Sequence, residues 1–142
     1  MPDQDIALYN RQLIALSSIP DEAHLQKPMH HARAYSPICG STVEIDLDSK
    51  DGRVTAFGYT VEACALTKTV LSVMQKAIIG QSASDIEKVA KEMQKMLCGL
   101  APQFPQIWAD LQILAPIKDH VARHNAVMLP FEAVEKALKN KD

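Results

Sequence analysis

Ser41 to Tyr59 read STVEIDLDSKDGRVTAFGY, and this segment carries the clearest structural pattern in the chain. Apolar and polar residues alternate strictly up to Asp48, as in a strand with one buried and one solvated face. The turn Ser49–Gly52 follows, and its Asp-Gly pair is typical of a tight hairpin, so that Val54–Tyr59 returns as the partner strand. We expect an antiparallel hairpin with Val43, Ile45 and Leu47 on its buried face and Thr42, Glu44, Asp46 and Asp48 on its solvated face.

The residues before the hairpin predict a helix, a connection and a short strand. Residues 3–17 fit a helix that Asp3 caps. A polar connection over residues 20–28 carries His24, and a short strand over residues 31–36 ends before Pro37. The apolar side of the helix consists of Ile6, Leu13, Ile14 and Leu16.

The residues after the hairpin are helical in pattern. Apolar residues recur with a 3.6-residue period from Leu66 to Gly80, where glycine is a natural stop. Ser84 and Glu87 form a capping box for the next helix. The inner face of that helix consists of Ile86, Val89, Ala90, Met93 and Leu97.

The last part of the chain is interrupted by prolines. It predicts a short helix over residues 107–111, a helical turn around His120 and a final helix over residues 127–139. Pro130 falls in the first turn of that final helix, where proline is tolerated. The order of elements predicts an α+β fold, in which helices pack on a small antiparallel sheet of two to three strands.

Length and composition limit the class of protein. The 142 residues suit one domain over 1–142, with 47% apolar and 23% charged residues as in a globular protein. The net charge is -2 and no basic block stands out, so we expect no nucleic-acid partner. No apolar run approaches the roughly 20 residues that span a membrane, and no signal-peptide core follows Met1. We therefore expect a cytoplasmic protein without a membrane partner.

Cysteines are the candidate functional residues. In a cytoplasmic chain they are expected to be thiols or ligands rather than disulfide halves. Cys39 lies in SPICGS (residues 36–41), beside a glycine that lets the backbone approach a metal closely. Cys64 lies in FGYTVEACAL (residues 57–66), where free amides at the start of a helix stabilise a thiolate. Cys98 ends an apolar helical run and is expected to be a small buried side chain.

These two cysteine frames, taken in this order, resemble the iron–sulfur cluster assembly scaffold family of IscU, SufU and the N-terminal domain of NifU. The Asp51–Val54 turn, the Phe57-Gly58 pair and the Ala133–Leu138 segment are also similar to that family. The resemblance implies a small antiparallel sheet with a helical layer, and a metal site at one exposed tip. It also implies a non-enzymatic scaffold that receives sulfur from a cysteine desulfurase and carries a [2Fe–2S] cluster, iron or zinc to acceptor proteins.

Three positions differ from the family pattern. Ser41 stands where aspartate usually follows Cys-Gly, Asn125 stands where IscU has histidine, and Ala126 stands where the family has its third cysteine. Serine and asparagine are poor ligands for soft iron or zinc. Two thiolates do not complete a tetrahedral zinc site or a cluster.

Two arrangements supply the missing ligands. His124 lies two residues from Ala126, and histidine replaces cysteine on one iron in Rieske centres. The predicted ligands are then Cys39, Cys64 and His124. Alternatively, a homodimer shares one cluster between two Cys39–Cys64 pairs, which gives the four thiolates that such clusters need.

Three functions remain open at this stage. The first is a scaffold-like protein that binds iron, a [2Fe–2S] cluster or zinc, or accepts sulfur, at Cys39 and Cys64. The second is a degenerate scaffold homologue that acts as an interaction module of the assembly machinery without a cluster. The third is an enzyme with Cys64 as nucleophile and His124 as base, although no oxyanion element, phosphate loop or carboxylate pair accompanies them.

Overall fold

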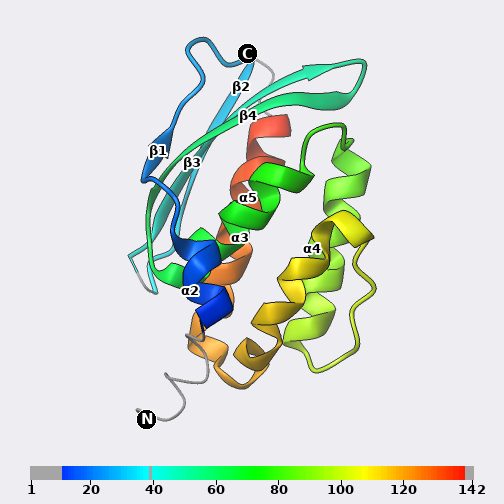
Figure 1. The fold of residues 1–142 in the computed structure, drawn as a ribbon. Coiled ribbons are helices and arrows are strands. Elements are labelled where there is room, and N and C mark those ends of the chain that lie inside the picture. Colours follow the sequence, from blue (N-terminus) through cyan, green and yellow to red (C-terminus); the bar gives the residue numbers. More distant parts are fainter. Residues whose placement is uncertain (1–10, 39, 140–142) are drawn as a thin grey trace.

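The structure is a computed structural model and describes residues 11–38 and 40–139. A layer of helices covers one face of a four-stranded antiparallel sheet with strand order β1-β4-β3-β2 (Figure 1). This arrangement confirms the α+β fold class. In chain order the elements are α2 (Arg11–Ser17), β1 (Glu22–Ala23), β2 (His30–Tyr35), β3 (Thr42–Lys50), β4 (Arg53–Glu62), α3 (Ala65–Ala77), α4 (Ala83–Leu97), the 3-10 helices η1 (Gln106–Asp119) and η2 (Val121–Arg123), and α5 (His124–Lys139).

The central hairpin forms as its alternation predicts. β3 pairs with β4 so that Val43 lies opposite Val61, and the side chains of Val43, Ile45 and Leu47 are fully buried. Asp51 and Gly52 both adopt positive φ, at 55° and 79°. A two-residue turn of this kind matches the twist of the two strands that it joins.

The sheet has one strand more than the expected two to three. The connection over residues 20–28 contains the two-residue edge strand β1, whose Ala23 pairs with Tyr59. Glycine permits this close approach, because a Cβ on Gly58 would lie 2.6 Å from the carbonyl oxygen of Ala23. The Tyr59 hydroxyl also donates to the Pro20 carbonyl over 2.9 Å. Two residues are too few to show alternation in the sequence.

Asp46 is buried, although its position on β3 predicted a solvated side chain. It is only 3% exposed. The segment that follows β1 brings the Leu25 amide to within 3.3 Å of its carboxylate, and His31 Nδ1 lies 2.6 Å away. His24 Nδ1 lies 3.4 Å from the same carboxylate. The solvated face of the hairpin is therefore partly covered by the segment that follows β1, and hydrogen bonds to Asp46 attach this segment to the sheet.

Helix α2 confirms only part of the expected first helix. Residues 11–17 are helical, whereas Asp3 and Ile6 lie outside the described residues. Leu13 is buried as expected, but Ile14 is 51% exposed and does not belong to the apolar side.

The capping box of α4 lies two residues earlier than the pattern predicted. Ser82, not Ser84, is the N-cap, and its hydroxyl accepts from the Asp85 amide over 3.1 Å. The Asp85 carboxylate accepts from the Ser82 amide over 3.0 Å. Aspartate can therefore take the role that the capping box assigns to glutamate, and this choice sets the helix start. The inner face predicted for α4 is buried.

The prolines near residue 105 lead into one long 3-10 helix rather than a short helix and a separate turn. In η1 the buried residues recur every third position, because side chains three apart lie above one another in a 3-10 helix. A search for a 3.6-residue period does not detect this spacing. The buried residues are Trp108, Leu111, Leu114 and Ile117.

Helix α5 begins at His124, three residues before its expected start. Pro130 therefore lies in the second turn and not in the first. A proline there has no N–H for the carbonyl of Ala126, four residues earlier. The consequence for the site is described below. Across residues 11–38 and 40–139, none of the helices combines the length and apolar content that crossing a membrane requires.

Candidate functional site

The sheet register brings the two cysteine-bearing segments to one end of the molecule. Thr42 at the start of β3 pairs with Tyr35 at the end of β2 and with Glu62 at the end of β4. The loop between β2 and β3 and the link from β4 to α3 therefore leave the sheet at the same end of the strands. Cys39 belongs to that loop and Cys64 to that link.

Cys64 is the N-cap residue of α3. Its thiol is free and exposed, and its side chain makes no capping hydrogen bond to the helix backbone. An N-cap side chain is directed toward the third residue of its helix. Accordingly, the Cys64 Sγ lies 3.8 Å from the hydroxyl oxygen of Thr67. The expected position of Cys64 at the start of a helix is confirmed.

Ala126, where the resemblance places the family's third cysteine, is linked to the helix that follows Cys64 through Thr67. The Thr67 hydroxyl donates a 2.8 Å hydrogen bond to the carbonyl oxygen of Ala126. Thr67 thus contacts both Cys64 and the first turn of α5. The sequence analysis did not identify Thr67. Pro130 was a usable signal, since a proline frees the carbonyl four residues before it, but the sequence does not reveal which group binds that carbonyl.

His124 is the first residue of α5. Its Nε2 lies 3.0 Å from the carbonyl of Ile117 and 3.2 Å from that of Lys118. Two acceptors at this nitrogen require that Nε2 carries the hydrogen. In the neutral ring, Nδ1 is then the nitrogen with the free lone pair. His124 as a ligand stays a prediction.

Cys39 lies outside the described residues, so its role also stays a prediction. The loop around it is closed by two backbone hydrogen bonds, from Ser36 to Ser41 over 2.9 Å and from Gly40 to Ser36 over 2.8 Å. Gly40 has a φ of 75°, in the left-handed region that favours glycine. Within the described ranges, no group of three or more His, Cys, Asp or Glu side chains is arranged to hold a metal ion.

A cavity of about 210 Å³ lies between the first three turns of α5 and the end of β2 with the residues that follow it. Burial raises the pKa of Glu132, which lines it, above the ordinary value for glutamate, and the carboxylate of Glu135 adds to this effect. Asn125, where the resemblance places the IscU histidine, lines the same cavity. The remaining lining residues are Tyr35, Ser36, Pro37 and Leu129.

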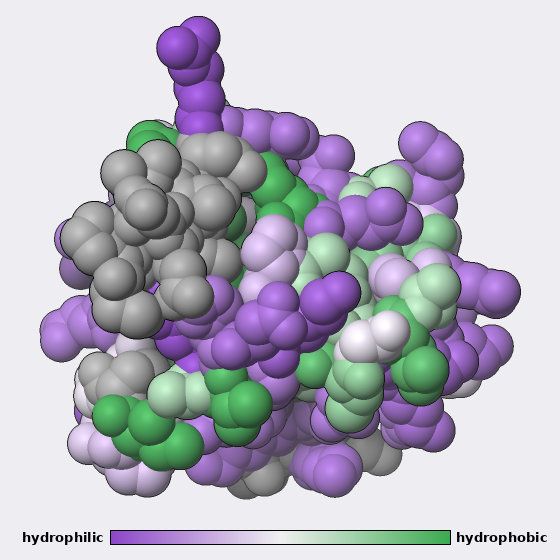
Figure 2. Space-filling view, turned by 90° about the horizontal axis from the view of Figure 1, so that it is seen from below, coloured by the Kyte–Doolittle hydropathy of each residue, from purple (hydrophilic) through white to green (hydrophobic). Residues whose placement is uncertain are grey.

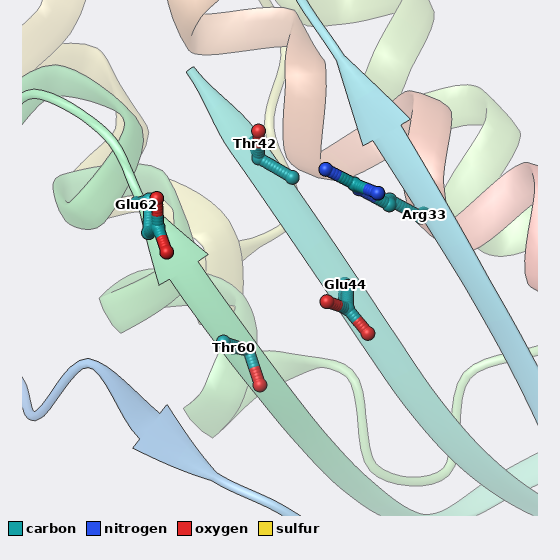
Figure 3. Close-up of a pocket in the computed structure, with 5 residues that line it drawn as sticks. All are labelled: Arg33, Thr42, Glu44, Thr60 and Glu62. Carbon is teal, nitrogen blue, oxygen red and sulfur yellow. The ribbon is translucent and has the colours of Figure 1, made fainter.

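A second, smaller pocket of about 60 Å³ lies on the strands themselves. Arg33 comes from β2, Thr42 and Glu44 from β3, and Thr60 and Glu62 from β4 (Figure 3). Glu44 also lies 3.3 Å from His31 Nε2. This pocket is charged and open, and the alternation of the hairpin had already placed Glu44 on the solvated face.

Apolar side chains are exposed near the candidate site. Ile38, next to Cys39, and Val121 in η2 are both largely exposed. From the end where α5 begins, the surface shows several separate hydrophobic groups among hydrophilic side chains (Figure 2). Cys98 was expected to be buried, but it is exposed at the C-cap of α4, because the apolar face of that helix ends at Leu97.

Comparison with known proteins identifies solved structures of similar fold. The fold is similar to the crystal structure of a nitrogen-fixing NifU-like protein (N-terminal) from Brucella abortus, with a TM-score of 0.88 and 31% identity over 96% of this chain and 95% of that chain. It is also similar to a SUF-system iron–sulfur cluster assembly scaffold protein from Fervidobacterium islandicum AW-1, with a TM-score of 0.82 and 17% identity over 92% of this chain and 96% of that chain.

A curated relative is similar in sequence. The iron–sulfur cluster assembly scaffold protein IscU from Streptococcus pyogenes serotype M1 is 19% identical over 124 residues, which is 82% of this chain and 78% of that protein. No protein-family model matches the chain.

Proposed function

Because the chain belongs to the iron–sulfur cluster assembly scaffold family of IscU, SufU and the N-terminal domain of NifU, we propose that it accepts sulfur and holds iron or a [2Fe–2S] cluster at Cys39, Cys64 and His124. The observation that carries the proposal is the 31% identity to a NifU-like structure over 96% of the chain. Iron, sulfide and the cluster are cargo for a scaffold. Its partners are a cysteine desulfurase, which supplies sulfur, and acceptor proteins.

The donor atoms suit this cargo. A thiolate is a soft ligand for iron–sulfur clusters and zinc, and imidazole also binds iron and zinc. Cys64 supports the proposal because its thiol is free and exposed at the helix start. Zinc is the second metal that such a set of thiolates and imidazole would take.

The tautomer of His124 supports its role as the third ligand. Ligating histidines almost always donate their other ring N–H to a carboxylate, a backbone carbonyl or water. The Nε2 of His124 is directed at the carbonyls of Ile117 and Lys118, which leaves Nδ1 as the donor to a metal. A small shift of the first turn of α5 would direct that nitrogen to the site.

A homodimer would complete the coordination in a different way. A [2Fe–2S] cluster takes four protein ligands, and one chain supplies two thiols and one imidazole in this proposal. Two chains that share one cluster would supply four thiolates from their Cys39–Cys64 pairs. Metal analysis distinguishes a site within one chain from a site shared by two chains, because the shared site holds half as much metal per chain.

Sulfur acceptance needs only one exposed thiol. The Cys64 sulfur would attack the terminal sulfur of a desulfurase persulfide, forming a new S–S bond while the S–S bond to the desulfurase cysteine breaks. The Cys64 proton goes to the departing thiolate, so a persulfide and a thiol are exchanged without net oxidation.

Oxygen-free reconstitution with ferrous iron and sulfide tests the proposal. We expect a coloured species that Cys64→Ala and Cys39→Ala each abolish and that His124→Ala weakens. Cys98→Ala is the matched control, because Cys98 is also free and exposed but lies at the end of α4. Mass spectrometry after incubation with a cysteine desulfurase and cysteine should detect added sulfur on Cys64.

The competing function is a degenerate scaffold that docks to the assembly machinery without a cluster. The replacement of the third cysteine by Ala126 favours it. A colourless protein that takes no sulfur, yet binds the desulfurase equally well without Cys39 and Cys64, would support this function instead of the first.

A further inference from the structure

One hydroxyl connects the helix that begins after Cys64 with the helix that begins at His124. Thr67 is fully buried. Its Oγ1 lies 2.8 Å from the carbonyl oxygen of Ala126, and the Sγ of Cys64 lies 3.8 Å from the same Oγ1. Thr67 and Ala126 are 59 positions apart in the sequence, so the bond is a tertiary contact.

The need for this bond arises within α5. A carbonyl inside a helix normally accepts from the N–H four residues later. For Ala126 that residue is Pro130, which has no N–H. The Thr67 hydroxyl is the donor that this buried carbonyl receives instead. A threonine carries one hydroxyl hydrogen, and the 2.8 Å bond commits it to Ala126.

We propose that Thr67 is a positioning residue that sets where Cys64 lies relative to the first turn of α5. The same oxygen contacts the sulfur and holds the backbone two residues after His124. Thr67 therefore lies between the two segments that carry the proposed ligands, since it packs against Cys64 and bonds the backbone two residues after His124. This role rests on the proposed function, because it concerns the geometry of ligands that the proposed function assigns.

Cobalt(II) binding tests the proposal, since a Co²⁺–thiolate bond gives a charge-transfer band whose energy and intensity report the coordination geometry. The experiment uses the full chain with Cys98→Ala, so that Cys64 and Cys39 are the only thiols. Thr67→Val removes the hydroxyl and keeps the branched shape, whereas Thr67→Ser keeps the hydroxyl. We expect Thr67→Val to weaken Co²⁺ binding roughly tenfold or more, as loss of an outer-shell partner does, and to change the band. Thr67→Ser should retain the parental affinity and spectrum.

A double variant separates positioning from stability. Pro130→Ala restores a backbone N–H for the Ala126 carbonyl. Thr67→Val in that background therefore leaves the carbonyl bonded but removes the hydrogen bond between α3 and α5. We expect this double variant to be folded and still to bind Co²⁺ weakly with an altered band. If Thr67→Val alone does not fold, Co²⁺ binding by the double variant tests the proposal.

Each outcome decides between the proposals. Parental affinity and spectrum in the double variant would overturn the role of Thr67 and leave the proposed function intact. Absence of a thiolate band in the parent chain would overturn the proposed function and, with it, this role. A weakened band in the Thr67→Ser variant, equal to that of Thr67→Val, would also refute a role for the hydroxyl.

Discussion

Removal of the Thr67 hydroxyl should destabilise the fold by an amount that depends on Pro130. Valine keeps the shape of threonine, so the main loss is the 2.8 Å bond to the Ala126 carbonyl. Ala126 is 2% exposed and Pro130 offers it no N–H, so the carbonyl would lose the hydroxyl that replaces the usual helix donor. Loss of the donor to a buried carbonyl costs roughly 1–3 kcal/mol. At roughly 2–4 °C per kcal/mol for a domain near this size, a loss of about 2 kcal/mol lowers the melting temperature by about 4–8 °C.

The same substitution should cost less once Pro130 is replaced. In the Pro130→Ala background, the N–H at position 130 bonds the Ala126 carbonyl, so Thr67→Val loses only one ordinary hydrogen bond, worth about 0.5–1.5 kcal/mol. Urea denaturation of the four proteins, followed by circular dichroism, measures the free energy of unfolding of each. The coupling between the two positions should be about 1 kcal/mol, which is typical of residues that share a partner.

Thr69→Val is the matched control. The Thr69 hydroxyl is buried on the same helix, donates over 2.8 Å to the carbonyl of Ala65 and lies 3.4 Å from the carbonyl of Leu13 in α2. The Ala65 carbonyl already accepts from the helix N–H four residues later, so the loss should be small and independent of Pro130. A Thr67→Val penalty that is equal in both backgrounds, or no larger than that of Thr69→Val, would refute the reasoning.

Two further predictions concern the sheet and α4. Gly58→Ala should destabilise the fold by roughly 1–3 kcal/mol and release β1, because the new Cβ would lie 2.6 Å from a backbone oxygen of Ala23. Denaturation measures the loss of stability, and amide exchange measures the release of β1. Unchanged protection of the β1 amides would contradict the packing argument. Hydrogen bonds from Ser82 lower the pKa of Asp85 below its ordinary 3.8, so its carboxylate stabilises the fold above that pH and the contribution is lost as the pH falls through the folded value. Asp85→Asn should therefore flatten the acid limb of the stability profile, and an unchanged limb would show that the capping box does not contribute.

Local pattern predicted the elements whose residues contact their own neighbours in the chain. The hairpin of β3 and β4 follows from a two-residue alternation around an Asp-Gly turn. The inner face of α4 follows from a 3.6-residue period. The 3.6-residue period did not predict helix η1, because the buried residues of η1 recur every third position. Strand β1 is only two residues long and depends on space above Gly58 in a different strand.

The candidate site divides in the same way. The frames around Cys39 and Cys64, the resemblance to cluster scaffolds and the location of Cys64 at a helix start can all be read from the sequence, because each depends on adjacent residues. The bond from Thr67 to Ala126 and the direction of the His124 ring depend on the packing of separate segments.

Burial of Asp46 under the segment after β1 also depends on such packing. A sequence pattern shows which side chains share a face, but a hydrogen bond between distant segments depends on where folding brings a donor and an acceptor together. Pro130 illustrates the difference between what the sequence shows and what folding decides. Its missing N–H is evident from the residue type, whereas the hydroxyl that replaces it lies on another helix and is identified only in the folded chain.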